Sequence, residues 1–171
     1  MAARRAAARA WRSTILAGVF PTHRPRRLRR TASLRKLVRE TTLEPRDLIL
    51  PLFFSETLRE PVPVSTMPGV SQLPVAEAAA VARMAREHDL GGVILFGLPR
   101  TKDARGTSAY DPEGPVPRAV RAMKDAAPEV GIMVDVALDP FTDHGHDGLL
   151  KDGRVINDDT VKVLVEQAIV Q

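Results

Sequence analysis

The richest group of chemically capable side chains lies in one segment of fourteen residues, Asp135–Gly148. It holds four carboxylates and two imidazoles: Asp135, Asp139, Asp143, Asp147, His144 and His146. Carboxylates together with water suit a hard cation such as Mg²⁺, whereas two histidines would also suit zinc. The alternative is a solvated loop, because aspartate and glycine are also the residues that form turns.

Asp135 differs from the other carboxylates because it is predicted inside an apolar strand, near the carboxyl end of that strand. A buried carboxylate needs a partner, so Asp135 is either a site residue or one half of a structural hydrogen bond. The sequence leaves both interpretations open.

Two further segments follow predicted strands, where the sites of parallel α/β folds lie. Pro99–Gly114 contains Lys102, the only lysine in such a loop, and the loop after the first strand offers Glu56, Arg59 and Glu60. A solvated loop is the simpler interpretation of both segments. The sequence contains no glycine-rich phosphate loop and no G-x-S-x-G motif.

Alternating strands and helices are predicted to position these loops. Apolar runs predict three buried strands, and helical spacing with capping residues predicts the helices between them. The strands are 47–54, 92–98 and 130–138, and the helices are 33–40 capped by Ser33, 74–89 capped by Gly91, 116–127, and a last one that starts at Asn157 or Asp158. Thr57 to Leu73 is predicted to be a long loop, and Asp152-Gly153 to be the turn of a hairpin.

This alternation predicts an α/β fold with a parallel sheet and right-handed crossovers. The sequence stops at Gln171, where a fourth strand is expected. Three parallel strands cannot close a barrel and would leave an apolar edge unpaired. The chain is therefore either a small open α/β layer or the first part of something longer.

Charge is distributed unevenly along the 171 residues. The net charge is +4, yet residues 1–39 hold twelve of the 25 basic residues and none of the 21 acidic ones. Residues 40–171 therefore carry 13 basic and 21 acidic residues, a net charge of −8, which disfavours nucleic-acid binding by the body. The absence of cysteine excludes disulfides and Cys-ligated zinc.

Residues 1–40 are predicted to form a basic N-terminal arm, with 1–25 disordered and 41–171 as the folded domain. A flexible arm that docks on a neighbouring subunit, an organelle-targeting segment and a nucleic-acid-binding segment all fit an arginine-rich, acid-free stretch. No apolar run reaches the length of a membrane span. Cytoplasm is the default location, and an organelle is the alternative.

The body resembles the N-terminal half of porphobilinogen synthase, also called 5-aminolevulinate dehydratase. The resemblance runs from about Arg26 to Gln171. It rests on RPRRLRRT at 24–31, DLILPLFF at 47–54, REPVPVSTMPGV at 59–70, SAYDPEGPVPRAVRAMK at 108–124 and DVALDPFTDHGHDGLLKDGRVINDDTVKVLVEQA at 135–168. The last block is long and specific.

The resemblance implies the first part, about three β/α units, of a TIM barrel with an extended N-terminal arm. It implies a subunit of a homo-octamer whose arm wraps a neighbour. The implied reaction condenses two molecules of 5-aminolevulinate to porphobilinogen with loss of water, in tetrapyrrole (heme) biosynthesis. It implies no nucleic-acid or membrane partner.

The resemblance also implies roles for individual residues. Asp135 matches the active-site aspartate of the family. Zinc-dependent members carry cysteines at the positions of Ala137, Asp139 and Asp147, so carboxylates there indicate the magnesium-using, cysteine-free branch, with Asp139 and Asp147 as metal residues. His144 and His146 match family positions too, in an indirect role rather than as ligands.

The two Schiff-base lysines of the family lie on later barrel strands, which this chain lacks. The isolated chain is therefore predicted to be inactive. The alternative hypothesis is a non-catalytic fragment that docks on a complete subunit through its arm and its open sheet edge.

Overall fold

The protein was examined as a computed structural model, which describes residues 26–171. The chain divides into two compact units, Met1–Leu43 and Glu44–Gln171, and each is described by itself. Much of the predicted arm, residues 1–25, lies outside the described residues. None of the described helices is long and apolar enough to cross a membrane.

The first unit is built from two short helical segments, η1 (Arg27–Arg29) and α2 (Ala32–Leu37). Thr31 caps α2, because its side-chain oxygen accepts a hydrogen bond of 3.2 Å from the backbone N–H of Leu34. The prediction of Ser33 as the cap is wrong, since Ser33 lies inside the helix. The helix also ends at Leu37, three residues before the predicted Glu40.

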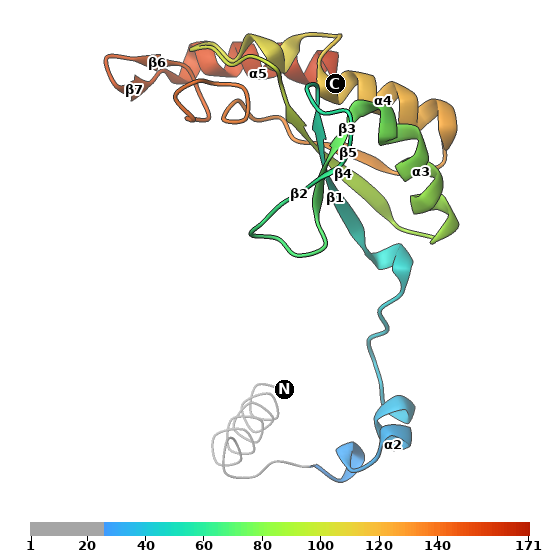
Figure 1. The fold of residues 1–171 in the computed structure, drawn as a ribbon. Coiled ribbons are helices and arrows are strands. Elements are labelled where there is room, and N and C mark those ends of the chain that lie inside the picture. The colour runs from blue at the N-terminus through green and yellow to red at the C-terminus, as the bar shows by residue number, and fades with distance from the viewer. Residues whose placement is uncertain (1–25) are drawn as a thin grey trace, which may run out of the picture. The chain divides into compact units, whose positions relative to one another are not determined.

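The second unit is a sheet with two helices on one face (Figure 1). The sheet contains β1 (Ile49–Ser55), β2 (Val62–Pro63), β3 (Ser71–Pro74), β4 (Gly92–Leu98) and β5 (Ile132–Val134), in the order β2-β3-β1-β4-β5. The helices are α3 (Ala78–Glu87) and α4 (Pro115–Ala126), and the short helical turns are η2 (Pro45–Asp47), η3 (Val75–Glu77) and η4 (Thr107–Tyr110).

The predicted parallel arrangement is confirmed, because β1 pairs in parallel with both β3 and β4, and β4 pairs in parallel with β5. The bounds predicted for β4 are the observed ones. The predicted loop from Thr57 to Leu73 is wrong in part, since it holds β2 and most of β3. These strands are too short and too rich in polar residues and proline to give an apolar signal.

Two buried clusters organise the second unit. The sheet core lies between the sheet and the helices α3 and α4, and it is formed by Leu52, Phe54, Val75, Ala78, Ala82, Ala85, Val93, Leu95, Val116, Ala119, Met123, Ala127 and Val130. The loop core lies under the loops after β4 and β5, and it is formed by Ala109, Leu138, Phe141, Leu149 and Val163. On the other face of the sheet, the rings of Phe53 and Phe96 stack at 5.3 Å.

The end of α3 corrects a predicted cap. Asp89, with a φ of 54°, is the left-handed residue there, and the N–H groups of Asp89 and Leu90 donate to the carbonyls of Arg86 and Ala85. This is the Schellman pattern that ends many helices. Gly91, the predicted cap, is instead required by close packing, because a Cβ atom there would lie 2.2 Å from the Arg46 carbonyl oxygen.

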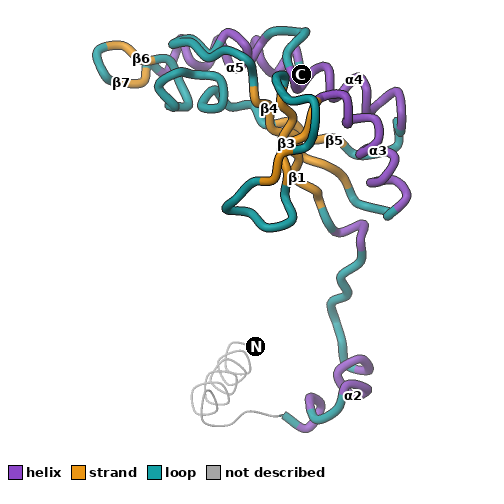
Figure 2. Tube along the Cα trace, in the orientation of Figure 1, coloured by secondary structure: helices purple, strands orange, loops and turns teal. Residues whose placement is uncertain are grey.

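The C-terminal part extends from the sheet as a hairpin and a long helix (Figures 1 and 2). The hairpin joins β6 (Leu150–Lys151) to β7 (Arg154–Val155). Its turn residues Asp152 and Gly153 both have positive φ, at 51° and 73°, which confirms the predicted turn. The last helix, α5, spans Asn157–Val170 and follows Ile156, without the predicted side-chain cap by Asn157 or Asp158.

Candidate functional site

Asp135 lies at the carboxyl end of β5, directly after its last residue. The prediction that it sits inside the strand is wrong, because the ladder between β4 and β5 ends at the pair Leu95 and Val134. Burial raises the pKa of the Asp135 carboxyl above its ordinary value, and the negative charges of Asp139 and Asp147 raise this pKa further. The fold therefore brings together the three carboxylates that the sequence singled out.

The backbone that follows Asp135 is held by two side chains. One carboxylate oxygen of Asp147 accepts a hydrogen bond of 2.6 Å from the N–H of Leu138. The amide nitrogen of Gln167 donates to the carbonyl oxygens of Asp135 and Ala137, at 3.4 and 3.1 Å. Asp147 thus has one oxygen engaged in the protein and one left for a ligand. Gln167 was missed by sequence reasoning, because a glutamine within a helical pattern carries no chemical signal.

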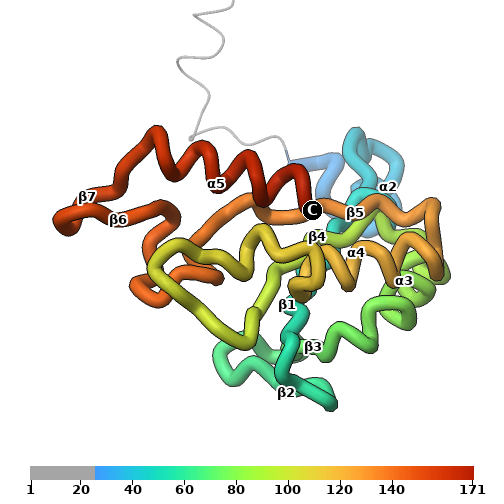
Figure 3. Tube along the Cα trace, turned by 90° about the horizontal axis from the view of Figure 1, so that it is seen from above, coloured from blue at the N-terminus to red at the C-terminus, as the bar shows by residue number. Residues whose placement is uncertain are grey.

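The loops after β4 and β5 are joined to each other through Asp103. Its N–H donates to the carbonyl of Phe141 at 3.4 Å, its carbonyl accepts from the N–H of Asp143 at 3.1 Å, and it forms a parallel bridge with Thr142. Figure 3 shows these loops side by side, the former in yellow tones and the latter in orange. The predicted sites in the two loops therefore belong to one region.

The side chain of Asp103 shapes its own loop. Its carboxylate accepts hydrogen bonds from the N–H of Arg105 at 2.8 Å, from the N–H of Thr107 at 3.2 Å and from the Thr107 hydroxyl. The Thr107 side chain, followed by backbone N–H groups, holds the pKa of Asp103 below its ordinary value, against a partial opposing effect of burial. Asp103 was not among the predicted site residues, although an aspartate shortly before Gly106 is a turn signal.

His144 is used within the protein through both ring nitrogens. Its Nδ1 accepts a hydrogen bond of 3.1 Å from the N–H of His146. That acceptor role places the proton on Nε2, which lies 3.3 Å from the Ala104 carbonyl oxygen and donates to it. His146 lies beside it, with ring centroids 5.6 Å apart. The geometry gives His144 a role in joining the two loops.

Within residues 26–171, no group of three or more His, Cys, Asp or Glu side chains is placed to hold a metal ion. Side chains of these four types near Asp135 thus offer a cation at most two ligands in this arrangement. Mg²⁺ accepts such a site, because it dehydrates reluctantly and is bound by one or two carboxylates with several retained waters. The donor set fits magnesium better than zinc, which prefers four protein ligands rich in nitrogen and sulfur.

The remaining candidates are exposed to solvent or bonded within the fold. Lys102 is exposed, and so are Arg59 and Glu60. Glu56 accepts a hydrogen bond of 2.8 Å from the N–H of Arg100. Glu56 and Arg59 line a pocket of about 280 Å³ at the ends of β1 and β3, together with Ser55, Leu58, Pro74, Val75, Ala76 and Arg118.

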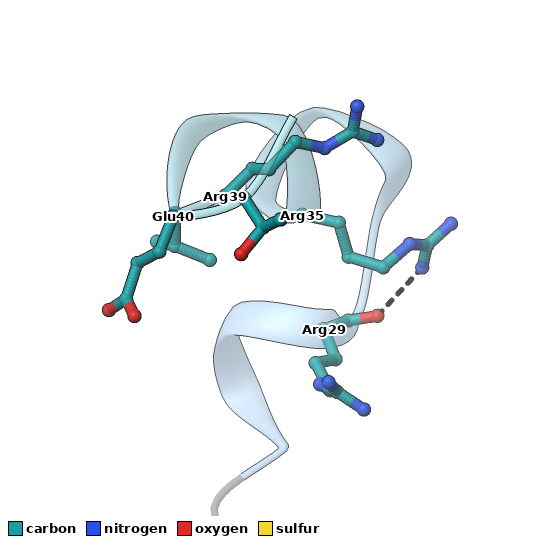
Figure 4. Close-up of a pocket in the computed structure, with 6 residues that line it drawn as sticks. Arg29, Arg35, Arg39 and Glu40 are labelled. Atoms are coloured by element: carbon teal, nitrogen blue, oxygen red, sulfur yellow. Dashed lines mark hydrogen bonds between the residues drawn. The ribbon is translucent and has the colours of Figure 1, made fainter. Parts of the chain in front are cut away.

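A larger pocket, of about 400 Å³, lies in the first unit (Figure 4). Arg29, Arg35 and Arg39 line it with Val38, Glu40 and Thr41. The guanidinium group of Arg35 donates to the carbonyl of Arg29 at 2.9 Å, which folds α2 back against η1. None of the residues that the sequence singled out for chemistry lines this pocket.

Comparison with known proteins assigns the whole described part of the chain to one family. The family model described as delta-aminolevulinic acid dehydratase matches residues 22–171. A delta-aminolevulinic acid dehydratase of Mycobacterium tuberculosis is 47% identical over 161 residues, which cover 89% of this chain and 47% of that protein. One from Archaeoglobus fulgidus is 41% identical over 150 residues, covering 88% of this chain and 46% of that protein.

A solved structure gives the same result. The delta-aminolevulinic acid dehydratase (porphobilinogen synthase) of Toxoplasma gondii, in complex with the reaction product porphobilinogen, matches with a TM-score of 0.78 and 38% identity. The match covers 86% of this chain and 43% of that one. The chain thus spans about half the length of the relatives it matches.

Proposed function

The chain belongs to the delta-aminolevulinic acid dehydratase family, and we propose that it forms the first part of an enzyme that condenses two molecules of 5-aminolevulinate to porphobilinogen with loss of water. The observation that carries the proposal is the placement of Asp135. It lies at the carboxyl end of β5, with Asp139 and Asp147 near enough to raise its pKa, and strand ends of this kind hold the active sites of β/α barrels.

Asp135 is proposed to move a proton in this reaction. A carboxyl group with a raised pKa holds a proton more readily than an ordinary aspartate does, which suits a group that takes up and releases protons. A condensation that expels water requires such transfers. In the chain without a bound cation, the charges of Asp139 and Asp147 add to this shift.

Asp139 and Asp147 are also proposed to hold a magnesium ion. One oxygen of Asp147 is already engaged by the N–H of Leu138, so that residue would bind through its other oxygen. When bound, the cation would supply positive charge beside the reacting groups. Its retained waters would complete the coordination shell.

The Schiff-base lysines that the resemblance implies are not provided by the described residues. A Schiff-base lysine needs a desolvated pocket that lowers its pKa. Lys124 instead donates to the carbonyls of Pro128 and Val130, at 3.2 and 2.8 Å. Lys162 pairs with Asp159 at 2.8 Å, and Lys36, Lys102 and Lys151 are exposed. We therefore propose that this chain alone does not turn over substrate.

The order of the sheet supports the proposal of a partial TIM barrel. β1, β4 and β5 lie side by side in the sheet in the order in which the chain reaches them, although the short strands β2 and β3 come between β1 and β4 in the sequence. All three are parallel, and the segments between them contain α3 and α4. Each unit of a β/α barrel adds its strand beside the preceding one in this way. We include assembly into a homo-octamer and a cytoplasmic location in the same proposal.

The experiment that tests the function is a chimera. Residues 22–171 of this chain are joined to the second half of the Mycobacterium tuberculosis relative, and porphobilinogen formation from 5-aminolevulinate is followed with and without Mg²⁺. We expect turnover by the chimera and none by the 171-residue chain. The matched pair of variants is Asp135→Asn, expected to lose at least 100-fold in kcat, and Asp143→Asn, expected to change little.

Each of three results would overturn one part of the proposal. A folded chimera that forms no porphobilinogen would remove the assigned reaction. Full activity of the Asp135→Asn chimera would leave the reaction but remove the role of Asp135. Turnover by the purified 171-residue chain would contradict the proposal that it is inactive.

A non-catalytic docking role is the second candidate, and the free edge of the sheet favours it. β5 pairs with β4 alone among the described strands, and Met133 in β5 is 44% exposed. An unpaired strand edge is a template for pairing with another chain. If this role is correct, the chain should co-elute with a complete subunit, and Met133→Lys should weaken that association.

A further inference from the structure

Gln167 is the most deeply buried polar side chain of the second unit. It lies in α5, and none of its surface is exposed. Burying an amide is unfavourable unless its polar atoms find partners. Its position within the helix therefore needs an explanation other than packing.

The partners of Gln167 lie about thirty residues earlier in the chain, at the end of β5. Its Nε2 donates to the carbonyl oxygens of Asp135 and Ala137. These two residues have already left the strand, which ends at Val134. The single amide group thus replaces the neighbouring strand as the hydrogen-bond partner of this backbone.

The oxygen of the same amide shows that burying Gln167 carries an energetic penalty. The Oε1 atom of Gln167 is buried without a hydrogen-bond partner among the described residues. A methionine of similar size would fill the same space without leaving an acceptor unpaired. The two hydrogen bonds to backbone carbonyl oxygens are therefore what a glutamine provides at this position and a methionine would not.

A second side chain holds the same segment from the opposite end. Asp147 accepts the hydrogen bond of Leu138, so the four residues Asp135–Leu138 are fixed both by α5 and by the loop that carries Asp147. The direction in which the Asp135 side chain leaves the backbone depends on the peptide groups that Gln167 holds.

We propose that Gln167 is a positioning residue that fixes the backbone carrying Asp135 and so sets the arrangement of Asp135 relative to Asp139 and Asp147. This inference rests on the proposed function, in which Asp135 takes part in the reaction. Gln167 itself does not contact the substrate in this proposal. It acts through the two carbonyl oxygens that it binds.

The test is made on the 171-residue chain by NMR. Gln167→Met keeps the volume of the side chain and removes both donors. We expect large changes in the chemical shifts of Asp135–Leu138 and about tenfold faster amide exchange at Leu138. The matched control is Val165→Gly, in the same helix but 52% exposed and outside the loop core, which destabilises α5 without changing a residue packed against Leu138.

A second variant separates hydrogen bonding from stability. Gln167→Glu cannot donate while its carboxyl is ionised, but it can donate one hydrogen bond once protonated. Its Asp135–Leu138 resonances should therefore move toward the wild-type positions as the pH falls. Those of Gln167→Met should show no such return. This comparison remains informative if Gln167→Met fails to fold.

The inference is overturned if Val165→Gly disturbs Asp135–Leu138 as much as Gln167→Met does, or if Gln167→Met leaves the segment undisturbed. Its failure is distinguishable from failure of the proposed function. If the NMR changes occur but the chimera with native Gln167 makes no porphobilinogen, the positioning role stands and the assigned reaction falls. If the chimera is active and Gln167→Met leaves its kcat unchanged, the positioning role falls alone.

Discussion

The sheet core and the loop core differ in how they are held together. The sheet core buries thirteen side chains between regular elements, and nearly all of its contacts are apolar. The loop core buries five, and Leu138, Phe141 and Leu149 among them lie in irregular backbone. Side chains such as Asp103, Asp147 and Gln167 supply the hydrogen bonds that this backbone lacks.

The difference has a consequence for the site. Apolar burial stabilises a layer without fixing any one atom, because the hydrophobic effect has no direction. Hydrogen bonds do have direction, so the carboxylates of the site are placed by the region that is weaker in burial and richer in polar contacts. Stability and placement are therefore separable by mutation.

The largest effect is expected in the sheet core. Phe54→Ala removes a fully buried ring in β1 and should lower the free energy of unfolding by about 3–5 kcal/mol, measured by urea denaturation. Its control is Phe53→Ala, the adjacent residue on the opposite, half-buried face, where the loss should be clearly smaller. Equal losses at the two positions would mean that the two faces of the sheet contribute alike.

Leu138→Ala should act on the loop core and spare the sheet. Leu138 is fully buried, and its truncation should cost about 2–4 kcal/mol. Hydrogen exchange should quicken in residues 103–109 and 138–149, while the amides of β1 and β4 stay protected. Val136→Ala, at a position 40% exposed, is the control. A uniform loss of protection across both cores would show that they unfold as one.

Asp103→Ala sharpens the comparison, because it removes hydrogen bonds rather than burial. We expect a loss of about 1–3 kcal/mol in the local stability of the two loops. The pKa of Asp103 is lowered in the folded chain, so its contribution is present above the unfolded pKa and is lost as the pH falls through the folded one. The protection factor of the Thr107 amide, which corrects its exchange rate for the intrinsic effect of pH, should therefore fall in acid in the wild type.

The control for Asp103 is Asp143→Ala, which leaves the backbone bond between the two residues in place. It should change the acid dependence of the Thr107 amide little. If Asp103→Ala retains that acid dependence in full, another carboxyl group holds the loop.

The two regions also differed in what could be predicted. The bounds of β4 followed from one continuous apolar run, and the turn at Asp152-Gly153 from residues that tolerate positive φ. β3 was missed because its pairing with β1 involves only three residues, none of which shows a strand pattern. The cap of α2 was misplaced by two residues, since both Thr31 and Ser33 are good capping types.

In the site, the sequence identified the carboxylates but not what holds them. The four aspartates of Asp135–Gly148 stood out because they gather at one predicted strand end, and the family resemblance selected Asp135, Asp139 and Asp147 among them. Asp103 and Gln167 did not, because each acts through backbone groups far away in the sequence. A contact of this kind is set by the tertiary fold, and local residue types do not encode it.

The smallest expected effect concerns Asp135, and its sign is opposite to that of Asp103. Burial and neighbouring carboxylates raise the pKa of Asp135 in the folded chain. Its ionisation therefore opposes folding, so stability is greatest below the unfolded pKa and declines as the pH rises through the folded one. Asp135→Asn should raise the melting temperature at pH 7 by roughly 1 °C and leave it unchanged near pH 3, as scanning calorimetry would measure.

A lower melting temperature of Asp135→Asn at pH 7 would mean that the carboxylate is a structural partner, the interpretation that the sequence left open. A higher melting temperature would mean that the native Asp135 carboxylate destabilises the folded chain. A carboxylate kept at a cost to stability is expected of a residue that serves chemistry rather than folding. The opposite signs expected for Asp103 and Asp135 thus make a measurement of stability a test of whether Asp135 is a structural aspartate or the functional one that we propose.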